Sequence, residues 1–158
     1  SQHIEHEIEL AVVIGKGGRW IRAHQALQHV LGYTIANDVT ARDLQQRDNQ
    51  WTRAKGFDTF CPLGPAIETE LDISDVLLTC RVNGEMRQMS STKEMVFSVP
   101  QLIAFISSIM TLDPGDIILT GTPSGVSELK DGDTLESEIE GIGILRNSVT
   151  SQTSIPPP

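Results

Sequence analysis

Long apolar runs and cysteines are scarce in this chain, and each scarcity argues against a class of protein. No apolar run approaches the roughly 20 residues that a membrane-spanning helix needs, and the first residues lack the basic region and apolar core of a signal peptide. The two cysteines, Cys61 and Cys80, fit neither a metal-binding spacing nor a disulfide framework. We therefore expect two buried, reduced thiols in a cytoplasmic protein.

Basic residues are also in the minority: 12 Lys and Arg against 21 Asp and Glu give a net charge of −9. This balance argues against nucleic acid and anionic membrane surfaces as partners. An anionic small molecule stays possible, because a bound metal or a local Lys or Arg can reverse the sign within a pocket. The chain has no Gly-x-Ser-x-Gly elbow and no P-loop lysine motif. Its histidines, at positions 3, 6, 24 and 29, lack metal-pair spacing, and we expect surface or structural roles for them.

The length of 158 residues fits one domain with its own core. Alternation and turn signals predict strands at residues 5–15, 33–36, 73–82, 117–120, 134–139 and 143–149, and helical spacing predicts helices at 21–31 and 98–110. Residues 40–56 are polar without a clear period, which indicates a functional or mobile segment. We expect an α+β, mostly β domain over residues 1–149 and a disordered Ser/Thr/Pro tail over residues 150–158.

Glutamates recur at every second position of the first predicted strand. Glu5, Glu7 and Glu9 would share one face, because side chains on a strand alternate between faces. Carboxylates lined up beside a buried strand repel one another and lose hydration, so a positive partner is expected. Mg²⁺ or Mn²⁺ is the natural candidate, since hard cations take carboxylate oxygens. The alternative is an exposed edge strand with solvated glutamates.

A second acidic segment follows the predicted strand at residues 33–36. The carboxylate of Asp38 could meet Glu7 and Glu9 there, although an Asn-Asp pair after a strand is commonly just a turn. A few residues later, Arg42 and Asp43 could pair locally as a structural clamp.

Two further segments carry groups that could bind an anion. Lys55 stands between apolar residues and glycine, so it could lie in a pocket and bind a carboxylate or enolate oxygen, or it could be an ordinary surface charge. In residues 120–125, glycines would let backbone N–H groups face an anion and Thr122 would add a hydroxyl. That segment could equally be only a turn.

Taken in order, these segments resemble the fumarylacetoacetate hydrolase family. The match runs through His-Glu-Ile-Glu-Leu-Ala-Val-Val-Ile-Gly (6–15), Tyr-Thr-Ile-Ala-Asn-Asp-Val-Thr-Ala-Arg-Asp (33–43), Lys-Gly-Phe-Asp (55–58), Cys-Pro-Leu-Gly-Pro (61–65), Val-Asn-Gly-Glu (82–85), Leu-Asp-Pro-Gly-Asp (112–116) and Thr-Gly-Thr-Pro-Ser-Gly-Val (120–126). Each motif alone is weak, but the ordered set is specific and covers nearly the whole chain.

The resemblance implies a mixed β-sandwich roll with two main helices and a usually dimeric enzyme. Family members cleave, decarboxylate or isomerise 2-oxo acids and related diketo acids, as in aromatic catabolism. The resemblance implies three roles for residues of this sequence: ligands of Mg²⁺ or Mn²⁺ (Glu7, Glu9 and Asp38), the active-site lysine (Lys55), and substrate contacts (Gln45, Thr122, Gly121 and Arg42).

The chain also departs from the pattern it resembles. Hydrolytic and decarboxylating relatives carry an N-terminal Gly-x-Asn-Tyr-like motif followed by a His and a Glu on a lid, and these activate water. This chain starts just before the Glu-x-Glu strand, and its first residue is not Met, so we expect a piece of a longer enzyme rather than a short paralogue with weakened chemistry. The alternatives are a metal- and carboxylate-binding domain without turnover, and a structural subunit with no tight divalent site.

Overall fold

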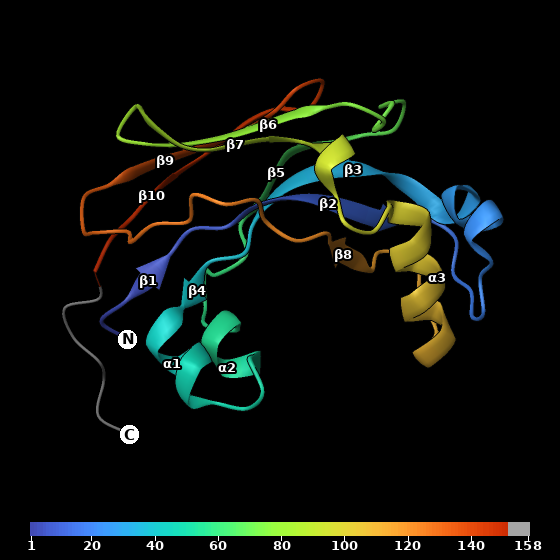
Figure 1. Cartoon of the computed structure of the whole chain (residues 1–158), viewed down its shortest axis with the longest axis horizontal. Coiled ribbons are helices and arrows are strands. Elements are labelled where there is room, and N and C mark those ends of the chain that lie inside the picture. Colours follow the sequence, from blue (N-terminus) through green and yellow to red (C-terminus); the bar gives the residue numbers. More distant parts are fainter. Residues whose placement is uncertain (152–158) are drawn as a thin grey trace.

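Two four-stranded antiparallel sheets form the body of the computed structural model, which describes residues 1–151 (Figure 1). The outer sheet has the order β10-β9-β6-β7, formed by β6 (Leu77–Val82), β7 (Glu85–Ser91), β9 (Thr134–Ile139) and β10 (Gly143–Ser148). The central sheet has the order β5-β3-β2-β8, formed by β2 (Ile8–Ile14), β3 (Val30–Asn37), β5 (Leu63–Glu68) and β8 (Ile117–Leu119). A short pair joins β1 (Ile4–Glu5) to β4 (Thr40–Ala41). The part of the predicted disordered tail from residue 152 onward lies outside the described residues.

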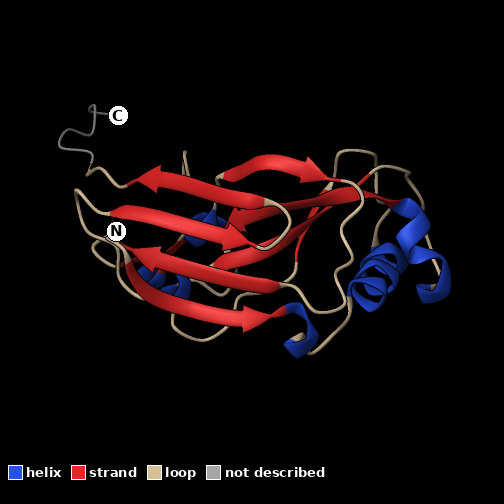
Figure 2. Ribbon diagram, turned by 90° about the horizontal axis from the view of Figure 1, so that it is seen from above, coloured by secondary structure: helices blue, strands red, loops and turns tan. Residues whose placement is uncertain are grey.

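The helices fall into two groups. In Figure 1, α1 (Arg42–Arg47) and α2 (Thr52–Lys55) lie on the side of the central sheet that faces away from the outer sheet. At one end of the sheets, α3 (Val99–Ile109) packs with the 3-10 helix η1 (Ala23–His29), as Figure 2 shows, and the short turn η2 (Thr92–Glu94) precedes α3. Within residues 1–151, no helix has both the length and the apolar character needed to cross a bilayer.

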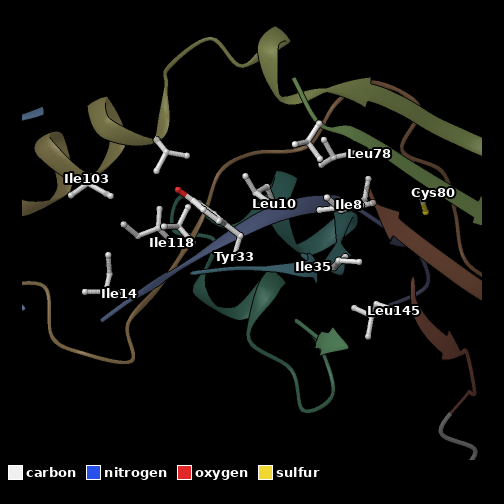
Figure 3. Close-up of a cluster of buried hydrophobic side chains, with 14 of the residues drawn as sticks. Ile8, Leu10, Ile14, Tyr33, Ile35, Leu78, Cys80, Ile103, Ile118 and Leu145 are labelled. Atoms are coloured by element: carbon white, nitrogen blue, oxygen red, sulfur yellow. The ribbon is translucent and has the colours of Figure 1, made fainter. Parts of the chain in front are cut away.

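Strand β2 separates the hydrophobic core from the opposite face of the central sheet. Ile8, Leu10, Val12 and Ile14 join the core cluster, to which the outer sheet adds Leu78 and other side chains (Figure 3). Because side chains alternate along a strand, residues at odd positions of β2 point to the face where α1 and α2 lie. The core therefore fixes β2 from one side and presents its odd-numbered residues on the other.

Several predicted elements are confirmed, and a local sequence signal marks the turn and the helix among them. Asn83 and Gly84 both have positive φ, as a two-residue hairpin turn between β6 and β7 requires. Helix α3 begins at a capping box of Ser98 and Gln101, with a proline in its first turn. Strand β9 has the predicted bounds. The α+β, mostly β fold class is confirmed as well.

Other predictions were wrong in detail. The segment predicted as a helix at 21–31 is a 3-10 helix that ends at His29, because Val30 pairs with Ile14 and starts β3. The segment at 40–56 is not irregular, since it forms β4, α1 and α2. The predicted strand at 5–15 is interrupted at residues 6–7, where the chain passes from pairing with β4 to pairing with β3. Cys80 is buried as expected, but Cys61 is only partly buried.

Candidate metal centre

Three carboxylates converge on the face of the central sheet that α1 and α2 cover. Glu7 precedes β2 and Glu9 lies within it, while Asp38 directly follows β3, the antiparallel neighbour of β2. The Asp38 N–H donates to the Glu7 carbonyl at 2.8 Å, and the Glu7 N–H donates to the side-chain oxygen of Asn37 at 2.8 Å. As a result, one carboxylate oxygen from each acid lies within 4.8 Å of the others.

Two cationic side chains from the helices contact these acids. Lys55, at the end of α2, donates to Glu7 at 3.0 Å, to Thr40 at 3.1 Å, and to Asp38. Arg42, at the start of α1, donates from Nη2 to Glu7 at 2.7 Å and from Nε to Glu5 at 2.6 Å. Glu7 is therefore held from two sides, one oxygen by each cation.

Lys55 is a protonated group in this setting. Burial alone would lower the pKa of its ammonium, but the hydrogen bonds to Asp38 and Glu7 outweigh burial and raise the pKa above its ordinary value. Lys55 therefore supplies positive charge and N–H donors at neutral pH. It is not suited to accept a proton as a general base.

Glu9 is the most strongly perturbed acid of the cluster. Its side chain is nearly inaccessible, with 3% of the residue exposed, and burial raises its pKa to about 7. The Gly121 N–H donates to its Oε2 at 2.6 Å and opposes that rise, while the neighbouring charges of Asp38 and Glu7 add to it. The charge of Lys55 lowers the pKa of Glu9, but within residues 1–151 no cationic side chain forms a salt bridge with Glu9 as Arg42 and Lys55 do with Glu7.

The charge balance of the cluster fits a divalent cation. Four carboxylates surround two cationic side chains: Glu5, Glu7, Glu9 and Asp38 against Arg42 and Lys55. With all four acids ionised, the excess is two negative charges, which one divalent cation would neutralise. Oxygen donors in this number suit hard cations such as Mg²⁺ or Mn²⁺, which fill the rest of their coordination shell with water or substrate.

The remaining residues expected at the site are engaged within the protein. Arg42 Nη1 donates to Gln45 Oε1 at 2.6 Å. The Gly121 N–H is used on Glu9, and the Thr122 hydroxyl donates to the Ile8 carbonyl at 2.7 Å. The segment 120–122 therefore lies beside the carboxylates and is bonded to β2.

The local clamp expected between Arg42 and Asp43 was wrong. Arg42 turns toward Glu5 and Glu7 instead, and the Asp43 carboxylate accepts a hydrogen bond from the Ser1 hydroxyl at 2.5 Å. The reason lies in the tertiary structure: β1 and the residues just before β2 bring the partly buried Glu5 and the buried Glu7 within reach of the guanidinium, which sequence neighbours alone do not show.

Sequence reasoning missed two groups next to the cluster. Thr40 donates to the Asp38 carbonyl at 2.8 Å and accepts from Lys55, and its position two residues after Asp38 is the signal that could have found it. Gln88 is buried on the core side of β2, where it contacts Thr122, and no local pattern marks it.

The sequence of this chain matches one protein family and several of its members. The family model described as "Fumarylacetoacetate (FAA) hydrolase C-terminal" matches residues 1–150. An uncharacterized protein of Methanocaldococcus jannaschii is 59% identical over 152 residues, covering 96% of this chain and 64% of that protein. The bovine (Bos taurus) protein named "Oxaloacetate tautomerase FAHD2B, mitochondrial" is 50% identical over 161 residues, covering 94% of this chain and 51% of that protein.

Solved structures agree with the sequence comparison. A 2-hydroxyhepta-2,4-diene-1,7-dioate isomerase from Mycobacterium marinum has a TM-score of 0.96 at 50% identity, covering 98% of this chain and 61% of that one. A 5-carboxymethyl-2-hydroxymuconate delta-isomerase from Mycobacterium smegmatis has a TM-score of 0.95 at 52% identity, covering 96% and 61%. The chain therefore corresponds to only part of each of these relatives.

Proposed function

The chain belongs to the fumarylacetoacetate hydrolase family, and we propose that it is the metal-binding catalytic domain of an enzyme that acts on 2-oxo or diketo acids. The observation that carries the proposal is the cluster of Glu7, Glu9 and Asp38 with the protonated Lys55 beside it. Of the reactions open to such a site, which include C–C bond hydrolysis and decarboxylation, keto–enol isomerisation is favoured. Two kinds of relative are named for isomerisation or tautomerisation.

A divalent cation held by Glu7, Glu9 and Asp38, Mg²⁺ or Mn²⁺, would supply Lewis acidity toward the 2-oxo and carboxylate oxygens of the substrate. Lys55 would act on the same substrate as a fixed positive charge. Its ammonium gains most where negative charge builds up, which in this reaction is the enolate oxygen, so it stabilises the transition state more than the bound substrate.

The groups around the cluster divide into positioning and substrate-binding roles. Arg42 holds Glu7 and Gln45 in place, and in this proposal it also contacts the substrate. Gln45 keeps its amide nitrogen for the substrate, since its oxygen accepts from Arg42. Gly121 and Thr122 belong to the 121–125 segment, whose other backbone N–H groups would hold the substrate carboxylate. The Gly121 N–H donates to Glu9 and the Thr122 hydroxyl donates to the Ile8 carbonyl, so these two groups would position the segment.

A homodimer is part of the proposal. Met89 on the edge strand β7 exposes 59% of its surface, and Val96 and Phe97, between η2 and α3, expose 88% and 59%. Exposed apolar side chains of this size favour an interface. Closed two-fold pairing is the commonest arrangement for such contacts. Light scattering at micromolar concentration should give twice the mass of the chain, and the mass of one chain would count against the pairing.

Titration calorimetry with Mn²⁺ tests the metal proposal. The chain should bind one Mn²⁺, and Glu9→Gln, which keeps the shape of the side chain but removes its charge, should weaken binding strongly. Glu70→Gln changes an exposed acid and should bind as the wild type does. Equal affinity for the wild type and Glu9→Gln would remove Glu9 from the site.

An activity assay separates an enzyme from a binding domain. With Mg²⁺ present, the conversion of oxaloacetate between its keto and enol forms can be followed by ultraviolet absorbance. Turnover that depends on Mg²⁺ supports the proposal. Mn²⁺ binding without turnover of any 2-oxo acid would favour a metal- and carboxylate-binding domain instead.

A further inference from the structure

A buried polar network lies on the core side of β2, behind the carboxylates, and Gln88 of β7 is its centre. Gln88 exposes 1% of its surface and His6 exposes none. The Gln88 Oε1 accepts from His6 Nδ1 at 2.9 Å and from the Ile8 N–H at 3.2 Å. Its Nε2 donates to Thr122 Oγ1 at 2.8 Å and to the Pro123 carbonyl at 2.8 Å. The amide therefore uses both acceptor sites and both N–H groups.

The orientation of this amide is fixed by the backbone. The Ile8 N–H can only donate and the Pro123 carbonyl can only accept, so the oxygen of Gln88 must face β2 and its nitrogen must face the 122–123 segment. A flipped amide would place two donors together and two acceptors together in a buried site, which is costly. Gln88 therefore links β2 to the 122–123 segment in a single orientation of its amide.

The two segments that Gln88 connects are those that build the candidate metal centre. On one side is the start of β2, whose opposite face carries Glu7 and Glu9. On the other side is the segment whose Gly121 N–H donates to Glu9 at 2.6 Å. The Thr122 hydroxyl completes the link, since it accepts from Gln88 and donates to the Ile8 carbonyl.

An irregularity in the outer sheet directs the Gln88 side chain toward β2 and the 122–123 segment. The register between β6 and β7 shifts next to Gln88, and Gln88 is buried whereas its neighbours Arg87 and Met89 are exposed. Gly125 passes so close to this irregularity that a Cβ there would lie 2.1 Å from the Arg87 carbonyl oxygen. The loop and the irregular strand therefore fit together only without a side chain at position 125.

We propose that Gln88 is a positioning residue for the metal centre. It sets the separation between the strand that carries Glu7 and Glu9 and the loop that carries Gly121, although it touches neither substrate nor metal itself. This inference rests on the proposed function, because it assigns Gln88 a role in that same site. Groups that hydrogen-bond directly to metal ligands typically change metal affinity about 10–100-fold when they are removed. Gln88 acts one step further out, through Ile8 and the 122–123 segment, so we expect an effect at the low end of that range.

The test measures Mn²⁺ affinity by calorimetry and the Mn²⁺ environment by electron paramagnetic resonance, with folding checked by circular dichroism. Gln88→Met keeps the length of the side chain and removes all four hydrogen bonds, and its dissociation constant should rise about tenfold with an altered spectrum. Val82→Ala opens a cavity in the neighbouring strand, where Val82 is buried, without touching the network. It should bind Mn²⁺ within about twofold of the wild type, since only general packing is lost.

A second pair of variants keeps the inference testable if Gln88→Met fails to fold. Thr122→Val removes the hydroxyl and should weaken Mn²⁺ binding, and Thr122→Ser retains the hydroxyl and should restore it. Wild-type affinity and spectrum in both Gln88→Met and Thr122→Val would overturn the positioning role. So would equal losses in Gln88→Met and Val82→Ala. In either case Glu9→Gln would still report on the proposed function, which fails separately if the wild type itself binds no Mn²⁺.

Discussion

The protonation of Glu9 should make metal binding depend on pH in a predictable direction. In the metal-free protein, burial raises its pKa from an ordinary value of 4.5 to about 7. A carboxylate must be ionised to bind a cation, so the proton has to leave when the metal arrives. Affinity should therefore rise as the pH rises through 7, and each binding event below that pH should release a proton.

The size of the effect follows from the same pKa. Glu9 would be ionised in about one molecule in eleven at pH 6 and in about ten in eleven at pH 8, so the apparent Mn²⁺ affinity should rise about tenfold over this range. Without metal, the ionisation of Glu9 should lower the free energy of unfolding as the pH rises. The folded state holds the proton of Glu9 more tightly than the unfolded state does, so the contribution of Glu9 to stability is fully present below pH 4.5 and is lost as the pH rises through 7. At about 1.4 kcal/mol per pH unit, the loss approaches about 3 kcal/mol.

Calorimetric titrations with Mn²⁺ at pH 6, 7 and 8, each in two buffers of different ionisation enthalpy, would measure both affinity and proton release. Release should be about 0.9 proton at pH 6, about half a proton at pH 7 and about 0.1 proton at pH 8. Glu9→Gln should bind weakly and lose this pH dependence. A wild-type dissociation constant that stays constant from pH 6 to pH 8, with no proton release, would refute the reasoning.

Three other predictions concern single side chains. Lys55→Met should lower kcat on a 2-oxo acid by at least tenfold with a smaller change in KM, because its charge acts mainly on the transition state, and an unchanged kcat would contradict that role. Gly125→Ala should lower the free energy of unfolding by about 3 kcal/mol or more, because the positive φ of Gly125 adds to a clash with backbone. Gly132→Ala is the control: Gly132 has positive φ but open space around it, so the free energy of unfolding should fall by only about 1–2 kcal/mol. Equal losses for the two variants in denaturant unfolding would contradict the clash. Burial raises the pKa of Cys80 to about 11, so at pH 8 a thiol reagent should modify the half-buried Cys61 first, and equal rates for both would contradict this order.

Local sequence patterns were sufficient for much of the fold. The Asn83-Gly84 turn, the capping box of α3 and the bounds of β9 each depend on residues within a few positions of one another. Periodicity failed where tertiary pairing decided the outcome. Residues 21–31 have helical spacing, but only Ala26 of η1 is buried, and Val30 is drawn into β3 by pairing with β2.

The sequence by itself determined that Glu7 and Glu9 share a face, because the two-residue period of extended backbone is a local property. Only the tertiary structure decided which side chains contact these two glutamates and the strand that follows them. Lys55 reaches Glu7 across 48 residues, and Gln88 reaches Ile8 across 80 residues. Contacts at such separations depend on the register of β2 with β3 and on how the two sheets close over the core. These depend on the packing of the whole chain, which no local spacing records.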